Sequence, residues 1–339
     1  MATLDIFNDD AFSVSQLTDT IVDIPRVPTM LGDMNLFSES GINTLTFMIE
    51  RKGAELNLVP TSPRGGVGQP TKTGTRKLIP LATVHLQEND AVLADVVQGV
   101  RAFGSETEVE TISGVVRDRL TLMKENLDLT LEFHRVGALK GKVLDADGTS
   151  VILDVYDAFG MTKTSQAWNI ETTNTSIDPV ELTYNLKRTI RNKLGGRGFS
   201  GVMVICNNDF LRNLLKHNKM KEAYALWREN AYLRTDSMGA DFVFNDVTFR
   251  VYDYDIGGSP IIAAGYAYAF PVGVQGMFRT VYSPADYMET VNTVGVPYYA
   301  KQERMAFDKG VGLEAQSNPL SYNKYPEAVI ELFHGAALP

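Results

Sequence analysis

The sequence predicts an α+β protein made of linked sub-domains. Three observations support this prediction: a chain of 339 residues, one very long amphipathic helix from Ser105 to about Leu139, and alternating helix and strand patterns between residues 179 and 281. The chain is too long for one simple core. Its 44% content of hydrophobic residues is enough to bury a sizeable one.

Composition excludes several classes of protein. The net charge of −9 argues against nucleic-acid binding as the main task, because neutralising phosphates requires clustered lysine and arginine. Cys206 is the single cysteine, so one chain can form neither a disulfide nor a cysteine-based zinc site, which fits synthesis in a reducing compartment. We expect no signal peptide, because the N-terminus is acidic and lacks an apolar core. We also expect no membrane span, because no apolar run approaches about 20 residues.

Residues 1–43 are predicted to form an extended arm. Seven acidic residues oppose one basic residue, Arg26, giving this segment a net charge of −6. Pro25 and Pro28 break regular structure, yet the segment is too apolar for a solvated tail. We therefore expect an extended arm that lies on other protein surface.

Residues 44–90 predict a two-stranded excursion with a flexible tip. Thr44–Glu50 alternates as a strand, and Leu78–Leu86 is a second apolar run interrupted by Pro80. Between them, Pro60–Thr75 holds four glycines and three prolines in sixteen residues. A lone two-stranded ribbon is only marginally stable, so this one should need a neighbouring molecule to lie on.

The excursion is also basic. Residues 51–80 carry a net charge of +5 in a chain of −9, with Glu55 as the one acid. Two interpretations are open: a solvated basic loop without a partner, or a limb that contacts an acidic surface, such as another copy of this chain. The candidate intersubunit residues are Arg51, Lys52, Arg64, Lys72, Arg76 and Lys77.

The long helix is predicted by its spacing and its cap. Ser105–Glu108 reads as a capping box. Apolar residues then recur at steps of three and four, with charged residues such as Lys124, Asp128 and Glu132 between them. The stripe consists of Val109, Ile112, Val116, Leu120, Met123, Leu127 and Leu131. At about 1.5 Å per residue the rod is about 50 Å long, so it is either a long helix of one large domain or a backbone that carries separate sub-domains.

Shorter elements follow in order. The predicted set comprises a hairpin of Val143–Leu144 with Val151–Val155, a helix from Asp178-Pro179 to Gly195-Gly196, a strand Val202–Cys206, a helix Phe210–Lys216 capped by Asn208 or Asp209, a helix Met220–Glu229, a hairpin turning at Asn245-Asp246, and a strand Ile261–Phe270 ended by Pro271. From residue 282 onward, prolines limit each strand-like piece.

The sequence contains no strong catalytic, cofactor or metal site. Gly196–Gly201 matches G-x-G-x-x-G, but it follows a helix and precedes a strand, whereas a dinucleotide site needs the opposite order. The stretch Asp145-x-Asp147-Gly148 lacks the later calcium ligands and is typical of a hairpin turn. The four histidines are scattered. We therefore predict no catalytic residues, no cofactor, no metal and no enzyme activity.

Several short motifs, taken with the order of elements, carry a resemblance. They are Ala138–Lys142 at the end of the long helix, Ala267–Pro271, Tyr282–Asp286, Glu314–Leu320 and Pro326–Ala328. In this order and spacing, the chain resembles the tailed-phage major capsid proteins of the lambda-like capsid protein E family.

The resemblance implies a Hong Kong 97-type capsid fold and assigns its parts. It implies an N-terminal arm at 1–43, an extended loop (E-loop) at 44–90, a peripheral domain at 91–178 with a spine helix at 105–139, an axial domain at 179–281, and a C-terminal return to the peripheral domain at 282–339.

The resemblance also implies a function. A major capsid protein self-assembles into the icosahedral shell around the genome of a tailed double-stranded DNA phage. The implied partners are other copies as hexamers and pentamers, scaffold, portal and decoration proteins, and packaged DNA bound without sequence specificity. The implied location is the virion, after assembly in the bacterial host cytoplasm. The alternatives are the shell of a cellular nanocompartment of the same fold and a soluble α/β enzyme with an unrecognised site.

Overall fold

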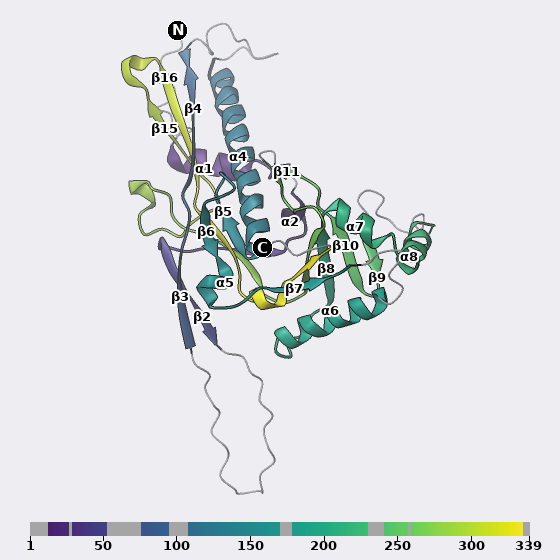
Figure 1. Ribbon diagram of the computed structural model, residues 1–339. Helices are drawn as coiled ribbons and strands as arrows, with labels where there is room; N and C mark the ends of the chain where they lie inside the picture. Colours follow the sequence, from purple (N-terminus) through teal and green to yellow (C-terminus); the bar gives the residue numbers. More distant parts are fainter. Residues whose placement is uncertain are drawn as a thin grey trace, which may run out of the picture. The chain divides into compact units, whose positions relative to one another are not determined.

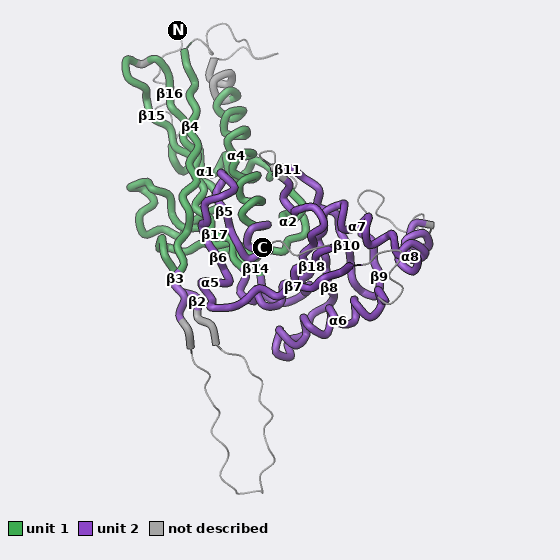
Figure 2. The backbone as a smooth tube through the Cα atoms, viewed as in Figure 1, with its two compact units in different colours: residues 1–47, 81–135, 278–322 green, residues 48–80, 136–277, 323–339 purple. Residues whose placement is uncertain are grey.

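The computed structural model describes residues 13–26, 29–52, 76–94, 108–169, 178–229, 241–256 and 259–334. The chain divides into two compact units (Figure 2). Unit 1 comprises Met1–Phe47, Leu81–Arg135 and Phe278–Tyr322, and unit 2 comprises Met48–Pro80, Val136–Met277 and Asn323–Pro339. Each unit is therefore assembled from three segments that are far apart in the sequence.

Unit 1 contains two three-stranded sheets and most of the long helix. Its elements are α1 (Val14–Asp23), α2 (Met30–Asp33), β1 (Phe37–Gly41), β4 (Leu86–Leu93), α4 (Glu108–Lys140), β14 (Phe278–Tyr282), η4 (Met288–Thr290), β15 (Tyr299–Arg304), η5 (Ala306–Asp308), β16 (Gly310–Ser317) and β17 (Pro319–Asn323). One sheet has the order β1-β14-β17, with β1 parallel to β14. The other has the order β15-β16-β4 and is antiparallel throughout.

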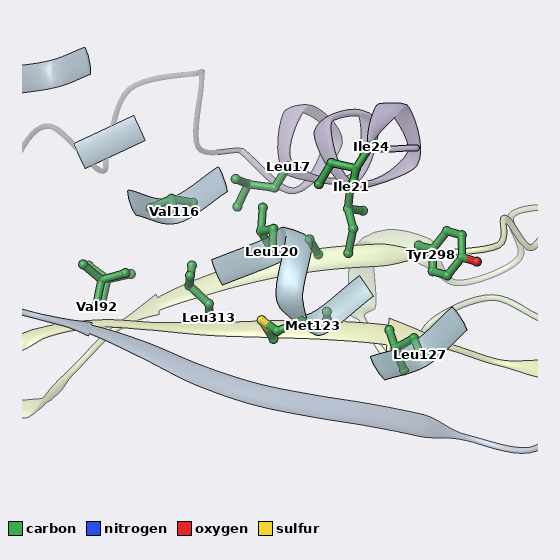
Figure 3. Close-up of a cluster of buried hydrophobic side chains, with 13 residues drawn as sticks. Leu17, Ile21, Ile24, Val92, Val116, Leu120, Met123, Leu127, Tyr298 and Leu313 are labelled. Carbon is green, nitrogen blue, oxygen red and sulfur yellow. The ribbon is translucent and has the colours of Figure 1, made fainter. Parts of the chain in front are cut away.

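The helix α4 confirms the long helix predicted from the apolar spacing, with 33 residues. Ser105, the proposed cap, lies outside the described residues. The stripe is buried from Val116 to Leu131. In the core of unit 1 it packs with side chains of the β15-β16-β4 sheet, among them Val92 and Leu313, and with α1 (Figure 3).

The N-terminal segment departs from the prediction of an extended arm. Ser13 accepts a hydrogen bond from the backbone N–H of Gln16 and caps α1, a helix of ten residues. Leu17 and Ile21, four residues apart, lie on one face of α1 and are buried in the core of unit 1. The prediction of an extended conformation was therefore wrong for this stretch, because Pro25 follows α1 and does not interrupt it.

Unit 2 contains a six-stranded mixed sheet and the remaining helices. Its elements are most of β2 (Thr46–Lys52) and β3 (Arg76–Ala82), then β5 (Lys142–Leu144), β6 (Val151–Asp154), α5 (Val155–Phe159), β7 (Thr164–Ala167), α6 (Pro179–Lys193), β8 (Gly201–Cys206), α7 (Asn208–Leu214), α8 (Asn218–Glu229), β9 (Phe242–Phe244), β10 (Val247–Val251), β11 (Asp255–Ile256), β12 (Ser259–Pro260), β13 (Tyr266–Val272), η6 (Pro326–Ala328) and β18 (Ile330–Phe333) (Figure 1).

The large sheet has the order β7-β18-β13-β8-β10-β9. Its central strands β8 and β13 are almost wholly buried, as expected for strands covered on both faces. The C-terminal part of the chain is divided between sheets: β15 and β16 pair in the sheet with β4, whereas β18 pairs with β13 and β7.

Two local predictions in unit 2 were wrong. The cap of α7 is Asn207, whose Oδ1 accepts from the Asp209 N–H at 2.8 Å, rather than Asn208 or Asp209. The strand expected at Ile261–Phe270 is β13, but it begins at Tyr266 and continues through Pro271 to Val272. Pro271 is tolerated because the pairing with β18 ends at Ala269, so the missing N–H removes no ladder bond on that side.

Other local predictions are confirmed. The helix opening at Asp178-Pro179 is α6, and the Asp178 side chain accepts from the Val180 N–H at 3.0 Å. The hairpin turn between β9 and β10 places Asn245 and Asp246 at positive φ, as a two-residue turn of this kind requires.

Candidate assembly surfaces

The described residues contain no cluster of three or more histidine, cysteine, aspartate or glutamate side chains that could hold a metal ion. Burial raises the pKa of the Cys206 thiol to about 12, which keeps it protonated and unreactive at neutral pH. Gly196–Gly201 follows α6 and precedes β8, so its amides do not open a helix towards a phosphate. None of the helices in the described ranges is long and apolar enough to cross a bilayer.

The most unusual feature of unit 1 is a line of buried charged residues along α4. We call it the α4 polar stripe, and it consists of Lys124, Asp128, Glu132 and Arg135. Steps of three and four place these residues on one side of the helix. Buried charges are strongly destabilising unless they are paired, so the partner of each one matters.

Lys124, which is only 1% exposed, holds the end of α1. Its Nζ donates to the carbonyl oxygens of Ile21 at 2.8 Å and Val22 at 3.2 Å, and also to that of Ile24. These carbonyls belong to the last turn of a helix, where they lack partners within the helix and carry partial negative charge. Desolvation by burial lowers the pKa of Lys124.

In the middle of the stripe, Glu132 and Asp128 each form a hydrogen bond with a further segment of unit 1. Glu132 accepts a hydrogen bond from the backbone N–H of Leu31, in the first turn of α2, at 2.8 Å. Asp128 accepts a hydrogen bond from the hydroxyl of Tyr298. Desolvation and the nearby Asp128 carboxylate raise the pKa of that hydroxyl, so it stays protonated and able to donate.

At the far end, Arg135 donates to Glu39 of β1 at 2.6 Å. Arg26 donates to both oxygens of the same carboxylate, at 2.5 and 2.9 Å. Desolvation would raise the pKa of Glu39, but the hydrogen bond from Arg26 and the charges of both arginines together lower it. The stripe therefore fixes α1, α2 and β1 on the long helix. The sequence placed these charges between apolar positions and gave no sign that they are buried.

The paired strands β2 and β3 present apolar side chains to solvent. Ile49 and Ile79 are buried, whereas Met48 and Leu78 are 65% and 59% exposed. Burial thus alternates along each strand, and the outer face of the ribbon carries exposed apolar side chains. We call Thr46–Lys52 with Arg76–Ala82 the β2–β3 ribbon.

Four of the six predicted contact residues lie on this ribbon. Arg51 and Lys52 end β2, and Arg76 and Lys77 begin β3, so the pairing of these strands brings four of the six positions onto one ribbon. For these four the backbone is described but not the side chains. Arg64 and Lys72 lie outside the described residues. That the six contact another copy stays a prediction.

Solved structures with this architecture identify the fold. The crystal structure of the putative capsid protein of a prophage of Escherichia coli CFT073 matches with a TM-score of 0.52, at 16% identity, covering 96% of this chain and 99% of that one. The mature capsid of bacteriophage PhiM1 matches with a TM-score of 0.50, at 9% identity, covering 94% and 90%. The fold is therefore the Hong Kong 97-type fold of phage capsid proteins.

The sequence comparisons identify the family. The family model described as phage major capsid protein E matches residues 13–333, and the chain belongs to that family. The major capsid protein of Salmonella phage Felix O1 is 26% identical over 95% of this chain and 96% of its own. That of Pseudomonas phage KPP10 is 24% identical over 94% and 96%. The chain is a structural protein of the virion that self-assembles into the capsid shell, and it is not an enzyme.

Proposed function

We propose that the shell is built from hexamers and pentamers of this chain, in which residues 44–90 of one copy act as an extended loop that lies across a neighbour. The observation that carries this proposal is the pair of exposed apolar side chains on the β2–β3 ribbon, Met48 and Leu78. An isolated two-stranded ribbon is marginally stable, and covering these side chains would stabilise it.

Charge supports the same contact. Residues 51–80 carry +5, whereas residues 1–43 carry −6 and the whole chain −9. The basic residues Arg51, Lys52, Arg64, Lys72, Arg76 and Lys77 would face acidic surface of the neighbouring copy. An exposed ion pair contributes only about 0–1 kcal/mol, but a shell repeats every contact in each subunit.

The parts of the chain take the roles that the resemblance implies. Residues 1–43 would form the N-terminal arm, 91–178 the peripheral domain with its spine helix at 105–139, 179–281 the axial domain, and 282–339 the return to the peripheral domain. The packing of β15 and β16 against α4 supports that return, and the buried contacts of α4 with α1, α2 and β1 support its role as a spine.

Further partners follow from the role of a major capsid protein. We propose that assembly takes place in the bacterial host cytoplasm with scaffold and portal proteins, and that decoration proteins bind the finished shell. Packaged DNA would face the inside of the shell without sequence-specific binding. The net charge of −9 supports this, because a negatively charged chain does not attract the DNA phosphates.

Deleting residues 63–72 tests the proposal. The variant should fold, with the circular dichroism of the parent chain, but should form no stable shells by electron microscopy. A control variant carries ten glycine and serine residues in place of the same segment. It keeps the length of the loop but removes its native side chains and their charge. Normal, heat-resistant shells from the deletion variant would contradict the proposed role of the loop.

A further inference from the structure

The tip of the hairpin between β15 and β16 carries an exposed aromatic side chain. Phe307 is 92% exposed and sits at φ 63° and ψ 22°, the left-handed region that bulky residues rarely adopt. The Nζ of Lys309 lies 5.9 Å from the centre of its ring. A solvated phenylalanine in this conformation buries almost no apolar surface in its own subunit, and strain of this kind clusters at functional positions.

Unit 1 also contains an open cavity with an apolar lining. It has a volume of about 520 Å³ and lies between the segment after β1, the link between β3 and β4, and the loop that contains η4. Met288 on its rim is 88% exposed. The apolar lining residues are Leu45, Val84, Pro284, Ala285, Met288 and Val291.

Several polar groups of the cavity hydrogen-bond one another. His85 Nδ1 lies 2.8 Å from Asn318 Oδ1, and the amide of Asn318 donates to the Pro284 carbonyl at 3.1 Å. The hydroxyls of Thr83 and Ser283 are 2.9 Å apart. Because these bonds are already made, the cavity is held in shape and offers mainly apolar surface, which suits an apolar guest.

One subunit cannot bring its own tip to its own cavity. Phe307 precedes β16, whereas Asn318 in the cavity wall directly follows it. The strand has eight residues, which at about 3.3 Å each separates its two ends by roughly 26 Å. Figure 1 shows the tip at the outer end of β15 and β16. The guest must therefore come from another molecule.

We propose that Phe307 of one copy inserts into this cavity of a second copy of the chain. The cavity has room for the ring, because clefts of about 300–1,000 Å³ take whole drug-sized ligands. Lys309 beside the ring would meet the exposed Asp286 on the cavity rim. Each copy then presents Phe307 on one surface and the cavity on another. This is the heterologous contact that a closed shell needs. None of the residues that line the cavity belongs to the β2–β3 ribbon.

Disulfide trapping between two variants tests the proposal. One chain carries Phe307→Cys and the other Met288→Cys, and the two are mixed before assembly and oxidised as shells. Cys206 is fully buried and its raised pKa keeps it out of the reaction. We expect a covalent dimer of the two different chains on non-reducing gels, formed in shells and absent from unassembled subunits.

Matched controls make each outcome decisive. In place of Met288→Cys, the exposed Leu122 on α4 carries the cysteine, and no dimer should form with Phe307→Cys. Shells of Phe307→Cys alone should also stay monomeric on the gel. Dimers from that single variant would show that the tips meet one another, and shells of the mixed chains without a disulfide would show that the tip lies elsewhere. Either result would overturn the proposal.

A second measurement needs no cross-link. Phe307→Ser should fold like the parent chain, because the side chain is exposed, but the concentration at which shells form should rise at least about tenfold, since about 1.4 kcal/mol corresponds to tenfold and burying a phenylalanine contributes more. Leu122→Ser is the control and should leave this concentration unchanged. If Phe307→Ser left the concentration at which shells form unchanged, this result would contradict the insertion of Phe307 into the cavity. Because the β2–β3 ribbon is intact in both variants, this result is separate from that of the loop deletion.

Discussion

Arg135 of α4 and Glu39 of β1 are 96 positions apart in the sequence, yet Nη2 of the arginine lies 2.6 Å from Oε1 of the glutamate. The same carboxylate accepts two hydrogen bonds from Arg26, which follows α1. One side chain thus joins the long helix, the first strand and the end of the first helix. Because Arg135 is only 5% exposed, its buried charge would destabilise unit 1 without this partner.

Replacing Glu39 by glutamine should therefore destabilise unit 1 in a pH-dependent way. The pKa of Glu39 is lowered in the folded protein, so its contribution to stability is present above the unfolded pKa of about 4.3 and is lost as the pH falls through the lower folded pKa. We expect Glu39→Gln to reduce the free energy of unfolding by about 1–3 kcal/mol at pH 7. The difference from the parent chain should shrink below about pH 4.

Urea unfolding of unassembled subunits at several pH values measures this effect. Glu125→Gln is the control, because Glu125 is an exposed carboxylate of unit 1, on α4. It should change the stability little at any pH. If the loss caused by Glu39→Gln stayed as large below about pH 4 as it is at pH 7, the ionised carboxylate would have no special role.

Lys124→Met should loosen the N-terminal helix. The methionine fills a similar volume but leaves the carbonyls of Ile21, Val22 and Ile24 without their shared donor. We expect a loss of about 1–3 kcal/mol, less whatever is regained because a buried cation is removed. Hydrogen exchange of the amides in α1 should accelerate, and the exposed Arg117→Met on the same helix should leave them unchanged. A fully protected α1 in Lys124→Met would show that apolar contacts alone hold it.

Leu120→Asp should prevent folding of unit 1. Leu120 is fully buried in the core between α4, α1 and the β15-β16-β4 sheet, and an unpaired buried carboxylate costs several kcal/mol. Insoluble protein is the expected product. Leu122→Asp, two positions along the helix where the side chain is 51% exposed, should stay soluble and assemble. Solubility after expression distinguishes the two, and soluble Leu120→Asp would refute the assignment of the buried face.

These variants also show what could be predicted from the sequence. The face of α4 was predictable because Leu120, Met123 and Leu127 repeat at the helical period, and that pattern needs no knowledge of the rest of the fold. The same holds for the cap at Asp178 and the turn at Asn245-Asp246, whose chemistry is local.

Features that depend on distant segments could not be read in this way. Lys124 and Glu132 look like ordinary surface charges until α1 and α2 cover them, and α1 itself was overlooked because two nearby prolines suggested an extended chain. The cavity beside Met288 is formed by segments more than 200 positions apart, so no local pattern predicts it. Exposure of Phe307 is likewise a property of the fold, since most phenylalanines are buried.

The last prediction concerns charge in assembly. The basic residues of 51–80 and the acidic residues of 1–43 have net charges of +5 and −6. Exposed charges are screened beyond about 8 Å at physiological salt, so attraction between copies should weaken as salt is raised, whereas apolar contacts are not screened. Reversing four basic residues to glutamate should therefore slow or block assembly, and the parent chain should assemble more slowly at high salt. The four are Arg64, Lys72, Arg76 and Lys77.

Light scattering across a salt series measures the assembly rate for both chains. A matched control makes the same change in net charge at four exposed residues of unit 2, namely Lys193, Lys216, Lys221 and Arg228. If general repulsion between more negative subunits were responsible, the control would slow assembly as much as the loop variant does. A slow loop variant beside a near-normal control would locate the effect in the basic residues, because only their reversal removes a specific attraction. Equal rates and equal salt dependence for the parent chain and the loop variant would leave apolar overlap as the driving force of assembly.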